Sequence, residues 1–314
     1  MEMLNDAANT DDMLANMFCL SADSAFELAE QGEDGTTSLK YYQESITLYE
    51  KALFYNSTIP ECYRDITIAY ARIGNTDLAA AELKLAADVG LSDDQLDMLQ
   101  GEISWSMGEY EAAYTSLENA LDLTKDDYIR YRTILVADKV TRDEANTISG
   151  KNSRMLAILE KQKELVGEQY RRVVTEMTAY AYVQQGEVTG NSEYYYKAAI
   201  CYEGLLKEGK LSYTLQKNYF NILYSRVKDY GRCAKLLDIM SRQAEDYWVY
   251  MNYSYTCIAS QQEKPVSEQS YSDAYEYYKK AEKLCAESGT NDPDMDTLRS
   301  TIDTLRSLGI IKEN

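Results

Sequence analysis

Residues Gly108–Leu121 read GEYEAAYTSLENAL, and their spacing decides the fold. A small residue stands at Ala113 and again at Ala120, with the bulky Leu117 between them. Residues three and four apart share one face of an α-helix, and two antiparallel helices approach closely where one presents a small side chain. Gly108 allows a sharp turn just before this helix. The stretch therefore predicts the second helix of a helical hairpin.

The same spacing returns at intervals of 34 residues towards the N-terminus. A small residue recurs in two columns, with a large apolar or aromatic residue between them. A fixed period of this length is typical of stacked helical hairpins, each of which buries its apolar face against the next. The two earlier copies are Gly74, Thr76, Ala79, Leu83 and Ala86, and then Lys40, Tyr42, Ser45, Tyr49 and Ala52.

These residues resemble the tetratricopeptide repeat family, whose period is about 34 residues. The resemblance covers roughly residues 40–125 and becomes degenerate elsewhere. The family's Leu-Gly pair reads Ile66-Thr67 in one hairpin and Gln100-Gly101 in the next, and the usual proline at the repeat end is mostly absent. The matching positions are Gly108, Tyr110, Ala113, Leu117 and Ala120 on the second helix, and Tyr63, Ile66 and Tyr70 on the first helix of the hairpin that begins at Pro60.

The resemblance implies an all-α fold: an α-solenoid, wound as a right-handed superhelix. We expect about seven tetratricopeptide-like hairpins and a C-terminal capping helix, in a single domain over residues 1–314. Regular repeats are expected over residues 26–127, degenerate repeats over 128–288 and the capping helix over 293–309. The chain contains only 3 prolines, which favours long helices.

Several local boundaries follow from capping and turn residues. Thr10 is expected to cap the first helix, and Ser92 and Ser212 are expected to cap later ones. Loops are expected over residues 32–38 and over 186–191, which read GEVTGN.

The formal net charge is -20, so the molecule as a whole should repel nucleic acid and anionic membranes. We therefore expect no nucleic-acid partner. Charge is unevenly spread, because residues 128–172 hold ten basic and six acidic side chains. Helix faces joined by ion pairs are the favoured interpretation of this basic segment. An anion or acidic-peptide contact site is the alternative.

No residue pattern predicts catalysis. The absence of histidine excludes Ser-His-Asp and Cys-His catalysis and any histidine metal ligand. The 6 cysteines are far apart without a Cys-x-x-Cys pair, and we interpret them as small apolar core residues. We therefore expect a non-enzymatic protein without catalytic, cofactor-binding or metal-binding residues. No apolar stretch predicts a signal peptide or direct membrane insertion.

The free thiols favour a reducing, cytoplasmic location, although the chain could also be the soluble domain of a membrane-anchored protein.

The resemblance implies that the first helix of each repeat lines a concave groove that binds a protein or peptide segment. Trp105 is either an anchor for that segment or a side chain stacked against Tyr110 and the neighbouring hairpin. The 29 tyrosines either pack between helices or line the groove. The groove positions expected to be exposed are Arg64, Ile68, Arg72, Met98, Glu102 and Trp105, continued by Arg132, Lys139 and Arg142; those expected to contact a partner are Arg64, Arg72, Met98, Trp105, Arg132, Lys139 and Arg142.

The most concrete functional prediction is a protein–protein interaction scaffold. A sensor or regulatory domain of a larger bacterial signalling protein, linked to a kinase or responsive to a peptide, is the alternative. One subclass of the family clamps a C-terminal carboxylate with lysine and asparagine on its first helices. Residues 1–39 contain no Lys or Arg, so that clamp is not expected here. The partner's identity and the oligomeric state stay open.

Overall fold

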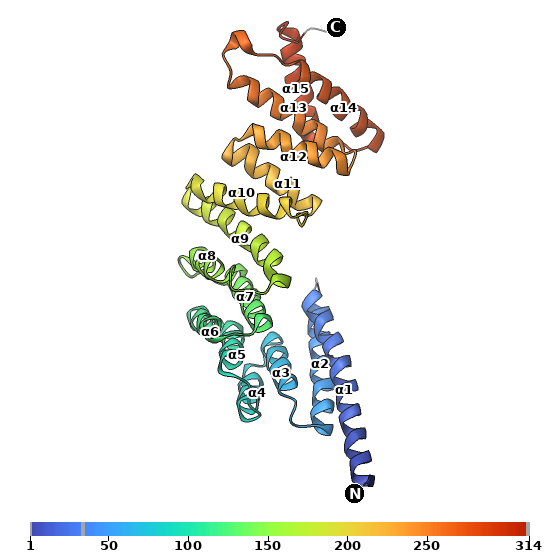
Figure 1. Ribbon diagram of the computed structural model, residues 1–314, viewed down its shortest axis with the longest axis vertical. Coiled ribbons are helices and arrows are strands. Elements are labelled where there is room, and N and C mark those ends of the chain that lie inside the picture. The colour runs from blue at the N-terminus through green and yellow to red at the C-terminus, as the bar shows by residue number, and fades with distance from the viewer. Residues whose placement is uncertain (1, 33–34, 312–314) are drawn as a thin grey trace. The chain divides into compact units, whose positions relative to one another are not determined.

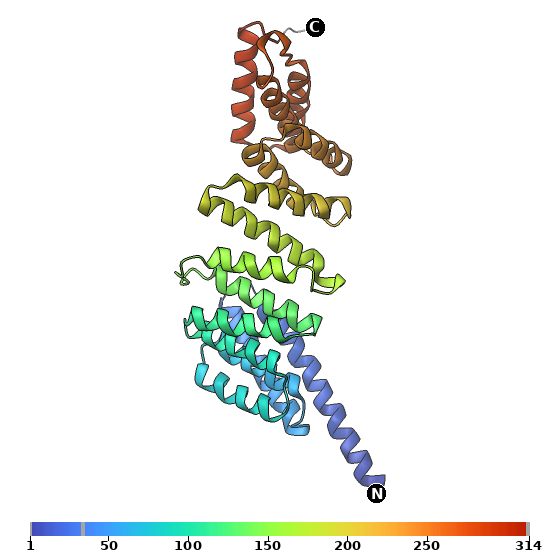
Figure 2. The ribbon, with the colours of Figure 1, turned by 60° about the vertical axis from the view of Figure 1, so that its left-hand side comes forward.

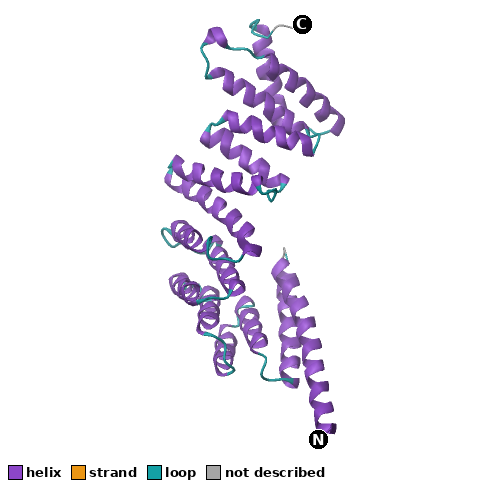
Figure 3. Cartoon of the chain, in the orientation of Figure 1, coloured by secondary structure: helices purple, strands orange, loops and turns teal. Residues whose placement is uncertain are grey.

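The computed structural model describes residues 2–32 and 35–311, and within them every regular element is a helix (Figure 3). Helices α1 to α14 form seven successive hairpins, and α15 follows them, which confirms the all-α solenoid class, the seven hairpins and the capping helix. The helices are α1 (Glu2–Gln31), α2 (Gly35–Tyr55), α3 (Pro60–Arg72), α4 (Thr76–Asp88), α5 (Asp93–Ser106), α6 (Tyr110–Leu123), α7 (Asp127–Arg142), α8 (Lys151–Gln162), α9 (Glu168–Thr189), α10 (Ser192–Lys207), α11 (Tyr213–Ile222), α12 (Tyr230–Gln243), α13 (Tyr247–Gln262), α14 (Ser272–Ser288) and α15 (Pro293–Ser307), with a π-helical turn η1 (Leu223–Val227) and a 3-10 turn η2 (Val266–Glu268).

The contacts divide the chain into two compact units, Met1–Val174 and Thr175–Asn314, called unit 1 and unit 2 below. The division falls inside α9, so no loop marks it. Each unit has its own buried side chains. A single domain over residues 1–314 stays a prediction.

The small-residue columns of the repeat lie where the helices of each hairpin meet. Ala86, Ala113, Ala120 and Cys233 are all 0% exposed, and the large residue between two small ones, Leu117, is equally buried. A methyl or thiol side chain at these points lets the helix axes approach, and the bulky neighbour fills the space beside it. The 34-residue spacing therefore reflects packing.

In unit 1 the first helices of successive hairpins contact one another (Figures 1 and 2). Helix α3 contacts both α1 and α5, and α5 contacts α7. We call α1, α3, α5 and α7 the inner layer. Gly108 has a φ of 75°, in the left-handed region that suits glycine, and it turns the chain from α5 to α6.

Two of the predicted boundaries are wrong. Thr10 lies inside α1, which begins at Glu2, so it is not a helix cap. Helix α9 continues through Gly186 to Thr189, although residues 186–191 read as a loop. A Cβ atom at Gly186 would lie 2.9 Å from the ring of Tyr195, so this glycine serves close packing between α9 and α10 rather than a turn.

The other boundary predictions are largely confirmed. Ser92 takes part in a capping box with Gln95 at the start of α5, and Ser212 accepts a hydrogen bond from the backbone N–H of Leu215. Helix α2 already begins at Gly35, so the loop expected over 32–38 is shorter, and its residues 33–34 lie outside the described part of the chain.

Two glycines inside helices give a matched test of this packing. A Cβ at Gly101 of α5 would lie 2.7 Å from Leu117 Cδ2, whereas one at Gly204 of α10 meets nothing within 4 Å. We expect Gly101→Ala to destabilise unit 1 by about 1–2 kcal/mol, because overpacking outweighs the gain in helix propensity. Gly204→Ala should stabilise unit 2 by up to about 1 kcal/mol.

Chemical denaturation followed by tryptophan fluorescence measures both effects, because the 2 tryptophans, Trp105 and Trp248, report on different units. Equal effects of the two substitutions would show that close packing at Gly101 does not limit stability.

Candidate functional site

Several positions expected to be exposed in the groove of unit 1 are instead buried. Met98, Ile68 and Glu102 are each 1% exposed, because the inner helices pack directly against one another. The exposure predicted for these three side chains is therefore wrong. Arg64 is mostly covered as well, and its Nε donates to Asp65 Oδ1 at 2.8 Å.

Glu30 of α1 connects the ends of the inner layer. Its carboxylate accepts hydrogen bonds from Lys139 Nζ of α7 and from the Tyr42 hydroxyl of α2, and Arg72 Nε of α3 lies 3.8 Å away. Beside this cluster, the guanidinium of Arg132 lies 5.9 Å from the centre of the Phe26 ring. Helix α1 thus reaches α7, three hairpins further along. Side chains near the C-terminal end of α1 therefore cover part of the inner face that was expected to form an open groove.

The electrostatics of Glu30 follow from these contacts. Burial by itself raises the pKa of a carboxylic acid, but the charges of Arg72 and Lys139 and the hydrogen bonds from Lys139 and Tyr42 outweigh it. The pKa of Glu30 falls to about 2. Burial and the adjacent carboxylate raise the pKa of the Tyr42 hydroxyl, which stays a hydrogen-bond donor.

Trp105 lies at the end of α5 between two charged groups. The Arg72 guanidinium lies 4.2 Å from the centre of its ring, and the indole N–H donates to Asp143 Oδ2 at 2.6 Å. The Tyr110 hydroxyl donates to the same oxygen at 3.3 Å. Burial alone raises the pKa of Asp143, but the hydrogen bonds from Trp105 and Tyr110 and the backbone N–H of Ala145 lower it overall. Trp105 therefore contacts the neighbouring hairpin and shares a hydrogen-bond acceptor with Tyr110.

A cavity of about 440 Å³ remains beside Trp105. Arg72 Nη2 donates to Glu102 Oε1 at 2.9 Å, but the second carboxylate oxygen, Oε2, is buried and accepts no hydrogen bond among the described residues. Exposed residues at the turn between α5 and α6 form the rim of the cavity. The lining residues are Ala71, Arg72, Glu102, Trp105, Ser106, Met107, Gly108, Tyr110 and Asp143.

The basic segment of residues 128–172 is held largely by ion pairs. Arg154 of α8 contacts Glu111 and Glu118 of α6, each at 2.7 Å. Arg142 pairs with Asp138, four residues earlier on α7, at 2.8 Å. These contacts support the interpretation of paired helix faces over the anion-site alternative.

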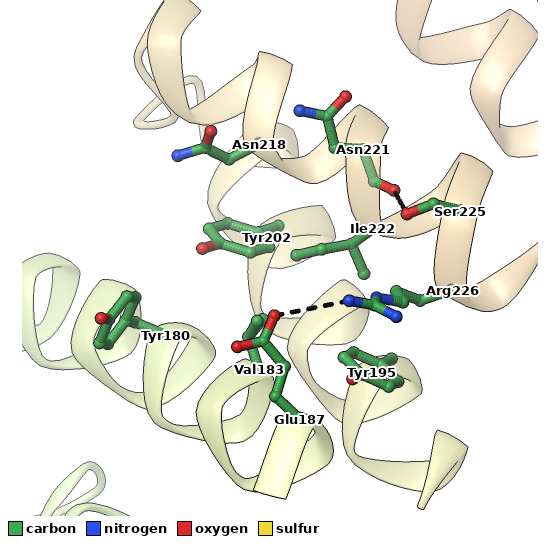
Figure 4. A pocket seen from close by; sticks show the side chains of 10 residues that line it. All are labelled: Tyr180, Val183, Glu187, Tyr195, Tyr202, Asn218, Asn221, Ile222, Ser225 and Arg226. Carbon is green, nitrogen blue, oxygen red and sulfur yellow. Dashed lines mark hydrogen bonds and ion pairs between the residues drawn. The ribbon is translucent and has the colours of Figure 1, made fainter. Parts of the chain in front are cut away.

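Unit 2 contains a second pocket, of about 300 Å³, between α9 and α11 (Figure 4). Its floor includes the buried rings of Tyr195 and Tyr202 of α10, and Asn218 and Asn221 of α11 project over it (Figure 4). The other lining residues are Tyr180, Val183, Glu187, Ile222, Ser225 and Arg226. The pocket thus combines an aromatic floor with carboxamide groups on one wall.

The π-helical turn η1 shapes one end of this pocket. It carries Ser225 and Arg226, and Lys228, which directly follows it, has a left-handed φ of 58°. The Arg226 guanidinium lies 5.3 Å from the centre of the Tyr195 ring and 3.6 Å from Glu187 across the pocket (Figure 4). Single π-turns inside α-helices are frequent at functional sites.

Sequence reasoning missed the pocket of unit 2. Asn218, Asn221 and Ser225 stand three and four residues apart, so a polar stripe on one helix face was visible in the sequence. Glu187 was assigned to a loop, and the sequence carries no signal for the π-turn that presents Arg226. The predicted residues of unit 1 do gather around the inner layer, but largely in contact with one another. Their role in partner binding stays a prediction.

The described residues offer neither a cluster of metal ligands nor a membrane-spanning helix. No group of three or more Cys, Asp and Glu side chains in this part of the chain is placed to hold a metal ion. Within the same residues, no helix is long and apolar enough to cross a membrane.

The Glu30 cluster predicts an acid-sensitive contribution to the stability of unit 1. Because the folded pKa of about 2 lies below the ordinary value of 4.5, the carboxylate stabilises the fold above about pH 4.5, and this contribution is lost as the pH falls towards 2. Glu30→Gln should therefore cost about 2–3 kcal/mol at neutral pH, and the difference from wild type should shrink in acid. Denaturation followed by Trp105 fluorescence in a Trp248→Phe background measures it.

Glu27→Gln is the matched control for this experiment, because Glu27 is an exposed carboxylate one turn earlier on α1. It should follow the wild type at every pH. An unchanged stability of Glu30→Gln at neutral pH would show that the cluster does not hold α1 in place.

No family model and no curated protein sequence matches the chain. Similar solved structures are the human IFIT1 dimer with PPP-AAAA (TM-score 0.39, 13% identity, 87% of this chain and 63% of that chain), the same dimer with m7Gppp-AAAA (0.38, 14%, 87% and 62%) and the S. pombe nuclear import adaptor Nro1 (0.35, 10%, 92% and 99%). The chain spans less than two thirds of the IFIT1 chain.

One sequence-based prediction is corrected by these structures. Nucleic acid was excluded as a partner on the basis of net charge, yet a helical-repeat chain, human IFIT1, is solved with PPP-AAAA and with m7Gppp-AAAA. The exclusion of nucleic acid is therefore withdrawn. The helices of the described residues show the class: the chain is a helical-repeat protein of the α-solenoid type.

Proposed function

We propose that this chain is a non-enzymatic binding scaffold of tetratricopeptide-like repeats that takes up a basic segment of another protein. A lysine or arginine side chain of the partner enters the cavity beside Trp105 and donates to Glu102. The observation that carries this proposal is the unsatisfied oxygen Oε2 of Glu102, on a side chain that is 1% exposed and lines the cavity.

A buried carboxylate oxygen without a donor is unfavourable by about 1–3 kcal/mol. Arg72 satisfies only one of the two oxygens of Glu102. A cationic donor from a ligand would satisfy the second one, and hydrogen bonds between charged groups are stronger than neutral ones. The energy gained on binding would thus come partly from removing an unfavourable feature of the free protein.

The charge around the cavity also favours a cation. Its lining contains one basic side chain, Arg72, and two acidic ones, Glu102 and Asp143. At the level of the whole chain, a net charge of -20 attracts a basic partner and accelerates its encounter. Local and long-range electrostatics therefore favour the same class of ligand.

The shape and polarity of the cavity fit a side chain better than a flat contact. Its volume of about 440 Å³ falls within the range of ligand pockets. The partner's side chain enters past the exposed Met107 and the turn at Gly108. The apolar stem of a lysine or arginine can then contact Met107 and Trp105 while its charged end reaches Glu102. The hydrogen bond from the indole N–H to Asp143 already holds the ring of Trp105 in place, so little side-chain freedom is lost on binding.

The pocket of unit 2 supports binding of a peptide main chain. A carboxamide both donates and accepts hydrogen bonds, as a peptide bond does, and Asn218 and Asn221 present two of them over a tyrosine floor (Figure 4). Such contacts do not depend on the sequence of the bound peptide. Specificity in this proposal comes from the cation site of unit 1.

The test compares two pentapeptides, Ac-Ala-Ala-Lys-Ala-Ala-NH2 and the same peptide with norleucine in place of lysine. Trp105 fluorescence in a Trp248→Phe background reports occupancy of the cavity. We expect saturable binding of the lysine peptide and at least tenfold weaker binding of the norleucine peptide, because the loss of a charged hydrogen bond corresponds to about 1.5–3 kcal/mol. Glu102→Gln should weaken lysine-peptide binding by a similar factor, since it removes the negative charge and replaces one of the two acceptor oxygens by an NH2 donor.

Glu109→Gln is the matched control, because Glu109 is an exposed acid in the same turn and does not line the cavity. It should bind as the wild type does, and circular dichroism should show the same helix content for both variants. Equal binding of the two peptides would contradict the cation site. Displacement of Trp105-bound peptide by a 5′-triphosphorylated oligoadenylate, with direct binding of that oligonucleotide at the same residues, would instead favour a nucleic-acid ligand.

A further inference from the structure

Two of the six cysteines lie against each other, although they are 43 residues apart in the sequence. Cys19 Sγ of α1 is 3.2 Å from Cys62 Sγ of α3. All six cysteines are in the thiol form in the structure. A disulfide S–S bond measures about 2.05 Å, so the two sulfurs would need to approach by roughly 1.1 Å to form one.

The two thiols differ in access. Cys62 is 1% exposed, whereas Cys19 is only partly covered. An oxidant in solution therefore reaches Cys19 first. Cys62 lies behind it, in contact with its sulfur, where a second thiol must lie to displace a leaving group from the first.

We infer that Cys19 and Cys62 form a redox-active pair that closes to a disulfide when the protein meets a small-molecule disulfide such as oxidised glutathione. The Cys19 thiolate attacks one sulfur of glutathione disulfide, which forms a protein–glutathione mixed disulfide and releases one glutathione thiolate. The Cys62 thiolate then attacks the Cys19 sulfur and releases the second glutathione. The net change is two protein thiols oxidised to one disulfide and one glutathione disulfide reduced to two glutathione thiols.

The surroundings make this reaction slow without an added oxidant. Burial and the nearby carboxylates of Asp23, Glu61 and Asp65 raise the pKa of the Cys19 thiol, and burial raises that of Cys62 as well. Since the thiolate is the attacking species, little of it is present at neutral pH. Proximity compensates in the second step, because Cys62 is already in contact with the sulfur that it attacks.

The charged groups that face the pair come from every helix packed against it. Asp23 is on α1, and Asp65 is on α3, where Arg64 pairs with it. Tyr49 of α2 donates to Asp23 Oδ1 at 2.7 Å. The reaction should therefore accelerate as the pH rises above neutral, as a thiolate reaction does.

The bond would fasten α1 to α3 covalently. Helix α1 also carries Glu30, which pairs with Arg72 of α3 and Lys139 of α7. Without the disulfide, only non-covalent contacts hold α1 against α3. With the bond, unfolding of unit 1 leaves a closed loop of the chain, which reduces the entropy of the unfolded state.

The experiment uses the full chain, reduced and then freed of reductant, with oxidised glutathione at pH 8. Intact mass spectrometry should show the loss of two hydrogens, and peptide mapping should identify one linked pair, Cys19 with Cys62. The oxidised protein should melt several degrees higher than the reduced protein, and dithiothreitol should reverse the shift.

Three variants separate this inference from general thiol oxidation. Cys62→Ala should stop at the mixed disulfide and carry one glutathione on Cys19, whereas Cys19→Ser should form neither product at Cys62. Cys257→Ser removes another partly buried thiol and should oxidise as the wild type does. Circular dichroism checks that each variant is folded.

The inference is overturned if the wild type takes up glutathione without an internal bond, or if peptide mapping links a different pair. It is equally overturned if Cys19→Ser still loses two hydrogens. None of these outcomes depends on whether a basic peptide binds beside Trp105.

Discussion

Close approach of paired helices at small side chains is the constraint on which the rest of the structure depends. Ala86, Ala113, Ala120 and Cys233 are completely buried where the two helices of a hairpin meet. A larger side chain at such a point would push the helices apart and expose the residues beside it. Once the hairpins are formed, their first helices lie side by side in unit 1, and every polar group on these helices must find a partner within the inner layer or face a cavity.

The inner layer of unit 1 shows how an acidic chain accommodates this requirement. Glu30 brings together side chains from α2, α3 and α7. Asp143 accepts hydrogen bonds from both Trp105 and Tyr110. Such clusters give the layer a fixed arrangement, because most of their donors have a defined acceptor. Some buried polar atoms of the layer have no hydrogen-bond partner in the described part of the chain, namely Arg72 Nε, Arg130 Nε and one oxygen of Glu102. The Glu102 oxygen belongs to a side chain that lines the cavity beside Trp105, which makes this cavity a candidate binding site.

Elsewhere in the chain, tyrosine hydroxyls also donate hydrogen bonds to carboxylates. Tyr49 donates to Asp23, Tyr213 to Asp246 and Tyr247 to Asp292. A tyrosine ring fills space between helices while its hydroxyl reaches the rim, where an acidic residue accepts the hydrogen bond. The excess of tyrosine over phenylalanine and the abundance of acidic residues are thus related, because the acidic residues accept hydrogen bonds from the packed tyrosines. In the pocket of unit 2, two other tyrosine rings, those of Tyr195 and Tyr202, form the floor, and the carboxamides of Asn218 and Asn221 also line it (Figure 4).

The sequence by itself determined the helices, the seven hairpins, the capping helix and the alanine columns, because these depend on periodicity over a few turns of chain. It also identified Arg72 and Trp105 as residues of interest, but it could not show that Met98 and Glu102 are buried or that α1 reaches α7. Those facts depend on the rotation of each hairpin relative to the next, which no local sequence pattern encodes. Only the tertiary structure placed Cys19 against Cys62, gave Gly186 a packing role and left one oxygen of Glu102 without a donor, because contacts between distant residues are fixed by the summed packing of all the helices between them.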